Sequence, residues 1–364
     1  MQKGNTKLLV AAVVALVLIV ALAFILPGML REPEPEPVAF RVGVVLSTGG
    51  RGDNSFNDAA IAGLERAVAE LGIEFQYQEP TEVPQMEEFH RLFAQEKMDL
   101  IIGVGFLQND AITKVATEFP EQKWAVVDTV IDLPNVKSLV FREHEGSFLA
   151  GALANMLTTT NNVGFVGGMQ IPLIGRFEKG FMHGVEHVNT LRNRTVTVQS
   201  AYIGTTGAAF RDPVRGKELA LAQIAQGADI IYHASGGSGQ GVFEAAAERG
   251  IKAIGVDSNQ NWVKPGTIIA SMLKRVDVVV FDAIKATKEG TFTAGANAFG
   301  VKEGGVGLTD LAVVTDVEKA ALNNDAAQIA LIQAMKDAIP ADVRQLIADL
   351  SAQIADGRIV VRSE

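Results

Sequence analysis

The sequence of 364 residues contains no cysteine. This absence excludes disulfide bonds, thiol catalysis, thiolate metal sites and lipidation on cysteine. Aromatic residues are scarce, at 6%, and positive charge is in deficit, with a net charge of −10. Such a balance argues against nucleic acid or an anionic membrane surface as a partner. Apolar residues (48%) and glycine (36 residues) are abundant, and the length suits two α/β lobes with a core each.

An uncharged run near the N-terminus, residues 8–30, follows Lys3 and Lys7. As a helix it would be about 34 Å long, enough to cross the hydrocarbon core of a bilayer. The positive charges before the run favour a cytoplasmic N-terminus with the remainder of the chain outside. We therefore expect residues 1–30 to form an uncleaved transmembrane anchor, with a cleaved signal segment as the alternative. Alternating Glu and Pro in residues 31–40 predict an extended linker.

The folded part begins with a strand pattern, a glycine-rich loop and a helix pattern. The strand starts at Val42, the loop covers residues 47–54, and the helix starts at Phe56 with Asn54 or Ser55 as its cap. The pattern returns without a gap, because residues 42, 56 and 63 align with residues 163, 177 and 184. Such loops lie at the carboxyl ends of strands, beside helix N-termini. Each half of the chain is therefore expected to offer one loop to a shared cleft.

Strand and helix patterns alternate along both halves, which predicts parallel sheets covered by helices on both faces. Helices are expected over residues 56–71, 84–96, 108–119, 143–157, 327–338 and 341–355. Strands are expected over residues 73–78, 100–104 and 124–127, and over residues 357–361, which would return to a sheet edge. Asp128 and Asp257 each follow a buried strand directly, at the end where such sheets bind ligands.

Taken together, several segments resemble the basic-membrane-protein family, the PnrA-like substrate-binding lipoproteins of ABC nucleoside importers. The matching motifs are GDNSFND (52–58), EHEGSFLAGALA (143–154), GFVGGMQIPLIGRFEKGF (164–181), FRDPVRGKELA (210–220), GADIIYHASGGSGQGVFEAA (227–246), GVDSNQ (255–260) and SMLKRVD (271–277). The resemblance implies a type I periplasmic-binding-protein fold, with two Rossmann-like lobes that are joined by a hinge and close on a nucleoside. Within residues 41–364, we expect lobe 1 to comprise about residues 41–141 and 258–300. Lobe 2 would comprise about residues 142–257 and parts of the C-terminal tail.

A nucleoside combines a flat base with ribose hydroxyls, so its site needs aromatic faces and hydrogen-bonding groups. Phe56 and Phe210 lie at loop-to-helix junctions in different lobes and are expected to stack on the base, unless they serve only core packing. The resemblance implies that Asp128 binds the edge of the base and Asp257 the ribose hydroxyls, with Lys274 between Asp257 and the ribose oxygens. For the two acids, a helix cap or a hinge hydrogen bond is the alternative, and for Lys274 a solvated position. Phe177, which aligns with Phe56, could stack on the base or pack in the core.

Small residues complete the predicted ligand-binding set. Asn54 and Ser55 are expected to provide polar contacts from the first loop. Gly236 and Gly237 would let the backbone approach the ligand closely and donate from N–H groups.

We therefore expect an extracytoplasmic, membrane-tethered receptor that captures a nucleoside, a purine nucleoside above all, by hinge closure. It would act as a monomer with ABC permease and ATPase subunits, without catalysis or a cofactor. The family is usually anchored through a lipidated cysteine, a role that the apolar run would take here. A metal is not expected, because the H-x-x-E-H pattern at residues 183–187 aligns with an ordinary helix face at residues 62–66. The alternatives are a sensory module that signals through a partner, binding of another small metabolite, and nucleoside hydrolysis by paired carboxylates.

Overall fold

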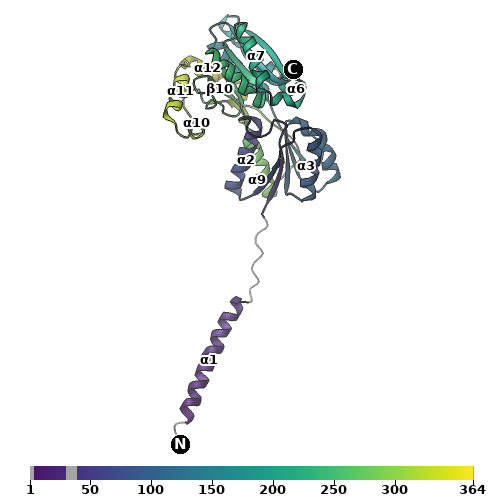
Figure 1. Cartoon of the computed structure of the whole chain (residues 1–364), viewed down its shortest axis with the longest axis vertical. Coiled ribbons are helices and arrows are strands. Elements are labelled where there is room, and N and C mark those ends of the chain that lie inside the picture. Colours follow the sequence, from purple (N-terminus) through teal and green to yellow (C-terminus); the bar gives the residue numbers. More distant parts are fainter. Residues whose placement is uncertain (1–3, 30–38, 364) are drawn as a thin grey trace. The chain divides into compact units, whose positions relative to one another are not determined.

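The computed structural model describes residues 4–29 and 39–363, and the chain divides into residues 1–39 and a compact unit of residues 40–364 (Figure 1). In the first unit, helix α1 (Gly4–Met29) exposes the side chains of residues 7–22. No helix among the described residues combines the length and apolarity that a membrane crossing requires. The predicted transmembrane anchor is therefore not supported. Residues 31–38 of the predicted linker, which was assigned to residues 31–40, lie outside the described residues.

The first sheet of the compact unit contains six strands, all parallel, in the order β11-β5-β4-β3-β1-β2. They are β1 (Arg41–Val45), β2 (Glu74–Gln78), β3 (Leu100–Val104), β4 (Trp124–Val127), β5 (Val136–Phe141) and β11 (Gly295–Phe299). Every residue of β3 and β4 is buried, as expected for central strands covered on both faces. Ile102 faces the core shared with α2 (Phe56–Leu71) and α9 (Val276–Lys288), whereas Ile101 faces α3 (Pro84–Gln95) and α4 (Asn109–Glu118).

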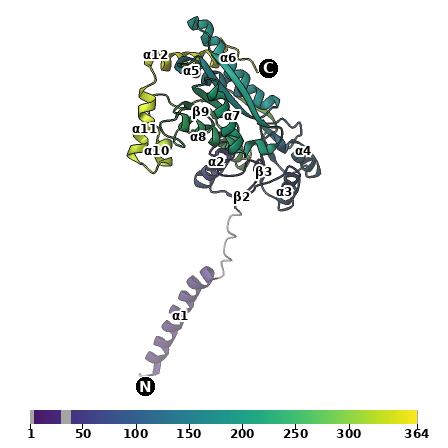
Figure 2. The ribbon, with the colours of Figure 1, turned by 45° about the horizontal axis from the view of Figure 1, so that its top comes forward.

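The second sheet repeats this plan in the order β12-β10-β9-β8-β6-β7, with only β12 antiparallel among its described strands. Its strands are β6 (Asn162–Met169), β7 (Thr197–Gly204), β8 (Ile230–Ala234), β9 (Lys252–Asp257), β10 (Ile268–Lys274) and β12 (Val306–Leu308). Tyr232 packs in the core formed with α5 (Glu143–Leu157) and α6 (Pro172–Arg192). Ile231 packs in the core formed with α7 (Pro213–Ala225) and α8 (Gly239–Arg249). Figure 2 labels both helices.

Two aligned glycines show that the repeat in the sequence is a repeat in the structure. A Cβ on Gly63 of α2 would collide with the carbonyl oxygen of Asp277 in α9. A Cβ on Gly184 of α6 would collide in the same way with the carbonyl oxygen of Phe148 in α5. Each glycine therefore lets two helices on its sheet approach closely, and the predicted two-lobe α/β plan is confirmed.

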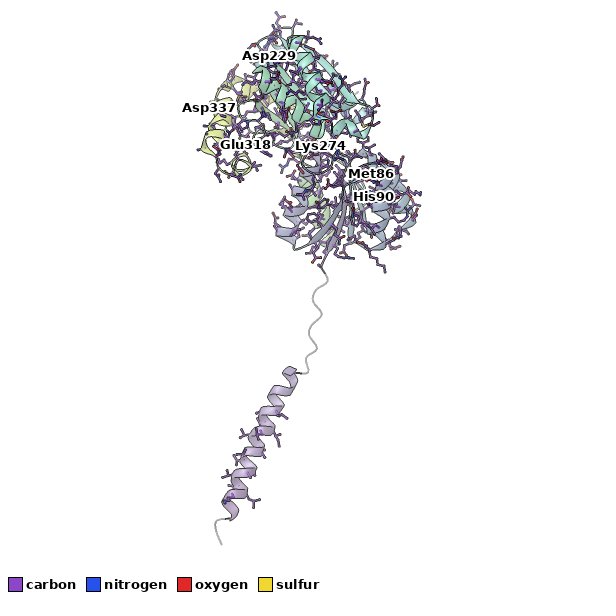
Figure 3. All side chains as sticks on the ribbon, viewed as in Figure 1. Met86, His90, Asp229, Lys274, Glu318 and Asp337 are labelled. Atoms are coloured by element: carbon purple, nitrogen blue, oxygen red, sulfur yellow. The ribbon has the colours of Figure 1, made fainter. Side chains whose placement is uncertain are left out.

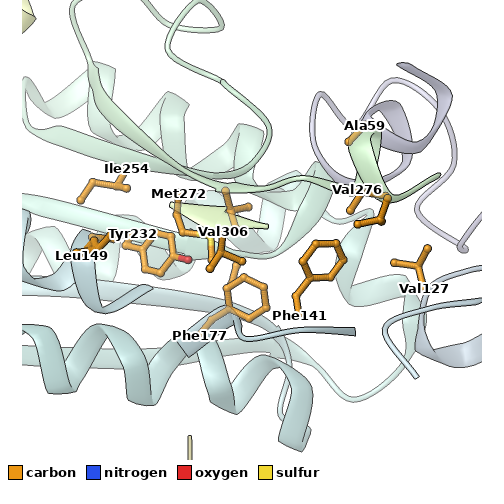
Figure 4. Close-up of a cluster of buried hydrophobic side chains, with 14 of the residues drawn as sticks. Ala59, Val127, Phe141, Leu149, Phe177, Tyr232, Ile254, Met272, Val276 and Val306 are labelled. Carbon is orange, nitrogen blue, oxygen red and sulfur yellow. The ribbon is translucent and has the colours of Figure 1, made fainter. Parts of the chain in front are cut away.

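The boundary between the lobes differs from the prediction, which assigned about residues 258–300 to lobe 1. Strand β10 pairs in parallel with β9 and thus belongs to the second sheet. The chain crosses between lobes at Arg142, at Arg275 and between β11 and β12. One buried apolar cluster continues through these crossings and includes Phe141, Met272 and Val306 (Figure 4).

The C-terminal region forms α10 (Asp316–Ala321), α11 (Ala326–Asp337) and α12 (Ala341–Ala355). Lys336 of α11 is fully buried, and its Nζ lies 3.1 Å from a carboxylate oxygen of Glu318, which Figure 3 labels. The strand predicted over residues 357–361 is wrong. Val361 is buried against the core, and the backbone N–H of Arg362 donates to Nδ1 of His183 on α6, so the tail packs on a helix instead of pairing with a sheet.

Candidate ligand-binding site

A cavity of about 610 Å³, counting the part open to solvent, lies between the two lobes at the carboxyl ends of the strands. Lobe 1 and lobe 2 both contribute to its walls. The lining residues are Ser47, Thr48, Phe56, Gly105, Phe106, Leu107, Asp128, Leu173, Ile174, Phe177, Phe210, Ala234, Gly236, Val256, Asp257 and Lys274. A mainly apolar wall with a few charged groups is typical of a small-molecule site.

The two predicted carboxylates occupy equivalent places. Asp128 follows β4 and Asp257 ends β9, and both line the cavity while being at least nine-tenths buried. Both also have left-handed backbone conformations, with φ of 73° and 63°. Residues other than glycine seldom adopt this conformation, and strain of this kind clusters at ligand sites. The backbone therefore supports a common role for the two acids in the cavity.

Lys274, which Figure 3 labels, lies at the end of β10. It links the lobes through a buried ion-pair cluster. Its Nζ lies 2.6 and 2.7 Å from the carboxylate oxygens of Asp128 and 3.3 Å from Oε1 of Glu143. Arg176 donates from Nε to Oε2 of Glu143 at 2.8 Å, so one carboxylate joins two cations. The prediction paired Lys274 with Asp257, whereas the structure gives it Asp128 and Glu143 as its direct partners.

Burial affects the ionisation of the charged side chains in this site. It raises the pKa of Asp257 to about 6, although Lys274 and a hydrogen bond from Ser55 Oγ (2.6 Å) act to lower it. Burial disfavours the ammonium of Lys274, but Asp128 and Glu143 outweigh it and raise the lysine pKa above its ordinary value. Burial also raises the pKa of Asp128, against the effect of Lys274. The site thus sets a buried lysine beside acidic side chains, a combination suited to hydroxyl and N–H donors and unfavourable to phosphate.

Aromatic rings from both lobes line the cavity. Phe56 begins α2 in lobe 1, and Phe210 ends the short helix η2 (Gly207–Phe210) in lobe 2. Phe106 of η1 (Phe106–Gln108) lies edge-on to Phe210, with ring centroids 6.5 Å apart. Lys274 Nζ lies 5.0 Å from the centroid of Phe56 and 5.5 Å from that of Phe177. Flat apolar faces therefore adjoin the charged cluster directly.

The first loop is organised by the side chain of Asp53, which was not among the predicted site residues. Ser55 holds the N-cap position of α2, as predicted, but its side chain makes no capping hydrogen bond. Asp53 accepts instead from the backbone N–H groups of Ser55 and Asn57, at 2.9 Å each. Ser55 instead bonds to Asp257 across the cleft, and the carbonyl oxygen of Asn54 accepts from Gln260 Nε2 at 3.0 Å. The loop thus ties lobe 1 to lobe 2.

The structure brings most of the predicted set together. Among the predicted residues, Phe56, Asp128, Phe210, Gly236, Asp257 and Lys274 line the cavity, whereas Asn54, Ser55 and Gly237 do not. Glu143 was missed, because nothing in a helical motif tells which distant lysine its first acid meets. Phe177, which aligns with Phe56 in the repeat and whose role the sequence left open between stacking and core packing, also lines the cavity.

The H-x-x-E-H residues lie on α6 outside this cavity. His183 and His187 both pack edge-on to Phe148, with ring centroids 5.1 and 5.3 Å apart. No group of three or more His, Cys, Asp or Glu side chains in the described part of the chain could hold a metal ion.

Comparisons with known proteins agree on the family. Residues 40–342 match the family described as ABC transporter substrate-binding protein PnrA-like. The chain is 32% identical over 347 residues to the ABC transporter nucleoside-binding protein BmpA of Lactococcus lactis, covering 89% of both chains. It is 33% identical over 352 residues to an uncharacterised lipoprotein of Pyrococcus abyssi, covering 91% of this chain and 86% of the relative.

A comparison with solved structures supports the same family. The crystal structure of an ABC transporter solute-binding protein from Aeropyrum pernix is 34% identical and superposes with a TM-score of 0.80. The match covers 89% of this chain and 94% of that one. The chain therefore belongs to the PnrA-like family of ABC transporter substrate-binding proteins.

Proposed function

We propose that this substrate-binding protein captures a nucleoside, with a purine nucleoside preferred, by closing its lobes around the cavity. The observation that carries the proposal is the meeting of aromatic faces from both lobes with buried carboxylates at two strand ends. Phe56 and Phe210 would stack on the base, and Asp257 would accept hydrogen bonds from the ribose hydroxyls. The bond from Ser55 to Asp257 and that from Gln260 to Asn54 join the lobes and would hold the closed form. The relative from Lactococcus lactis is a protein named as nucleoside-binding, which supports the same ligand class.

The protein would deliver this ligand to permease and ATPase subunits, the partners with which ABC substrate-binding proteins work. We propose that it does so as a monomer on the extracytoplasmic side. Light scattering should then give a mass near 38.7 kDa, and added protease should reach the protein on intact cells. A dimer mass or full protection from protease would contradict these two proposals.

Replacing Phe56 or Phe210 with leucine tests the stacking. Leucine keeps apolar bulk but offers no flat face, and base stacking is worth about 1–3 kcal/mol per base. We expect each variant to bind inosine between about 5-fold and 100-fold more weakly in calorimetric titration. Phe75→Leu, a change at a ring outside the cavity, is the matched control and should bind as the wild type does. Equal affinity in both cavity variants would contradict the proposed stacking.

The affinity should also depend on pH, because the raised pKa of Asp257, about 6, lies close to neutrality. Only the carboxylate accepts hydrogen bonds from two ribose hydroxyls. Inosine binding should therefore be about tenfold weaker at about pH 5 than at about pH 7. In the free protein, the stability that protonated Asp257 contributes is fully present below about pH 4 and is lost as pH rises through about 6.

Titrations of the wild type and of Asp257→Asn across this range check the pH dependence. The variant lacks the titrating group, so its weaker binding should stay flat. A flat profile in the wild type would count against a carboxylate role for Asp257.

A further inference from the structure

Three hydroxyl side chains lie in or beside the first loop, and two of them have partners inside the protein. Ser47 Oγ accepts from Asn57 Nδ2 at 2.9 Å, and Ser55 Oγ donates to Asp257. Thr48 is only 5% exposed, yet its Oγ1 has no hydrogen-bond partner among the described residues. Buried hydroxyls in native proteins almost always have a partner, so this one needs an explanation.

Thr48 occupies a distinct place on the cavity wall. It lines the ligand cavity and also a second, outer groove between the lobes, formed by Thr48, Thr81, Glu82, Val83, Pro84, Ile203, Gly204, Thr206, Gly207, Ala208, Ala209, Arg211 and Asp212. Asp128, Asp257 and Lys274 line the inner cavity alone. Thr48 therefore lies on the side of the cavity that faces the outer groove.

Across the cleft, Thr48 faces lobe 2. A Cβ built on Gly207 would lie only 2.5 Å from Thr48 Oγ1, so the hydroxyl points toward the start of η2. Gly207 has no side chain and offers no side-chain partner. Leu107, which also lines the cavity, would lie 3.1 Å from the same Cβ and is apolar. The surroundings thus bury the hydroxyl without giving it a hydrogen-bond partner.

The other buried polar atoms without a partner do not share this position. The residues absent from the cavity lining are His90, Trp124, Glu143, His144, Asn155 and Gln223. Asp128 Oδ1 lacks a hydrogen bond of good geometry but lies 2.6 Å from Lys274 Nζ. Among described residues that line the cavity, Thr48 alone carries an uncharged polar atom that is buried and without a partner.

We propose that the Thr48 hydroxyl is a specificity-determining ligand contact, which selects a polar atom on the end of the ligand that faces the outer groove. The inference rests on the proposed function: with the ribose held at Asp257, this polar atom belongs to an edge of the base. A hydroxyl both donates and accepts, so it can bond to a carbonyl oxygen, an amino group or a ring nitrogen. Binding would give the hydroxyl the partner that it lacks in the free protein.

Two substitutions test this contact. Thr48→Val replaces the hydroxyl with a methyl group of similar size, and Thr48→Ser keeps the hydroxyl as the matched control. We expect Thr48→Val to bind inosine about fivefold to tenfold more weakly in calorimetric titration, with Thr48→Ser near the wild type. Without ligand, Thr48→Val should unfold at the wild-type temperature or above it, because no hydrogen bond is lost.

Two results would overturn the proposal: equal inosine affinity in Thr48→Val and wild type, or a clear fall in the unfolding temperature of ligand-free Thr48→Val. The second result would mean that the hydroxyl has a structural partner. If inosine binds to none of the three proteins, the proposed nucleoside function fails. The same variants are then titrated with whichever free base, sugar or amino acid raises the wild-type unfolding temperature. A selective loss in Thr48→Val supports the contact even then, and an equal affinity overturns it.

Discussion

Replacing Lys274 with methionine is expected to lower the free energy of unfolding by about 3–5 kcal/mol. The ammonium lies between Asp128 and Glu143, and all three side chains are at least nine-tenths buried. Methionine fills similar space but removes the cation between the two buried carboxylates, while Arg176 stays paired with Glu143. An uncompensated buried charge is among the most destabilising changes in a protein. Denaturant unfolding near neutral pH measures the effect.

The stability of the variant should recover partly as pH falls, because burial already raises the pKa of Asp128 and its protonation removes one unpaired charge. Lys264→Met, at an exposed lysine, is the control and should change stability by less than about 0.5 kcal/mol. If Lys274→Met unfolds at the same denaturant concentration as this control, the buried cluster does not hold the lobes as described.

Replacing Asp257 with asparagine is expected to weaken nucleoside binding by about 100-fold or more. The carboxylate is 7% exposed and lies at a strand end in the cavity, where two hydroxyls of a ribose could donate to it. Hydrogen bonds to a charged group are worth about 1.5–3 kcal/mol each, and about 1.4 kcal/mol corresponds to tenfold. Asparagine keeps the shape but loses the charge and presents an amino group to one hydroxyl.

Although Asp257→Asn should bind nucleosides more weakly, its free energy of unfolding should not fall. Near neutral pH the ionised Asp257 is buried against its raised pKa of about 6, so a neutral amide should leave the free protein at least as stable. Asp282→Asn, at an exposed acid, is the control for binding. Wild-type affinity in Asp257→Asn, or a loss of affinity caused only by unfolding, would rule out the proposed contact.

Much of the fold could be predicted from the sequence because the patterns are local. Helix α2 starts at Phe56 and ends before Gly72, whose φ of 62° suits a glycine, as the pattern predicted. Strands β3 and β4 have the predicted bounds. Asp128 and Asp257 were found because an acid that directly follows a buried strand lies at the binding edge of a parallel sheet.

What could not be predicted depends on contacts between distant segments. The partners of Lys274 come from β4 and α5, so no motif around residue 274 identifies them. The place where the chain returns to lobe 1 depends on the pairing of β10 with β9, which a single apolar run does not specify. The apolar tail at residues 357–361 fits a strand pattern, but burial against the core satisfies it equally well.

The central claim is that the cavity binds nucleosides, and a ligand panel tests it most directly. Thermal unfolding of the purified protein would be followed with purine and pyrimidine nucleosides, free bases, nucleotides, sugars and amino acids. We expect nucleosides alone to raise the unfolding temperature, purine nucleosides most, with nucleotides excluded by the buried carboxylates. A rise with sugars or amino acids, or none with any nucleoside, would contradict the proposed function.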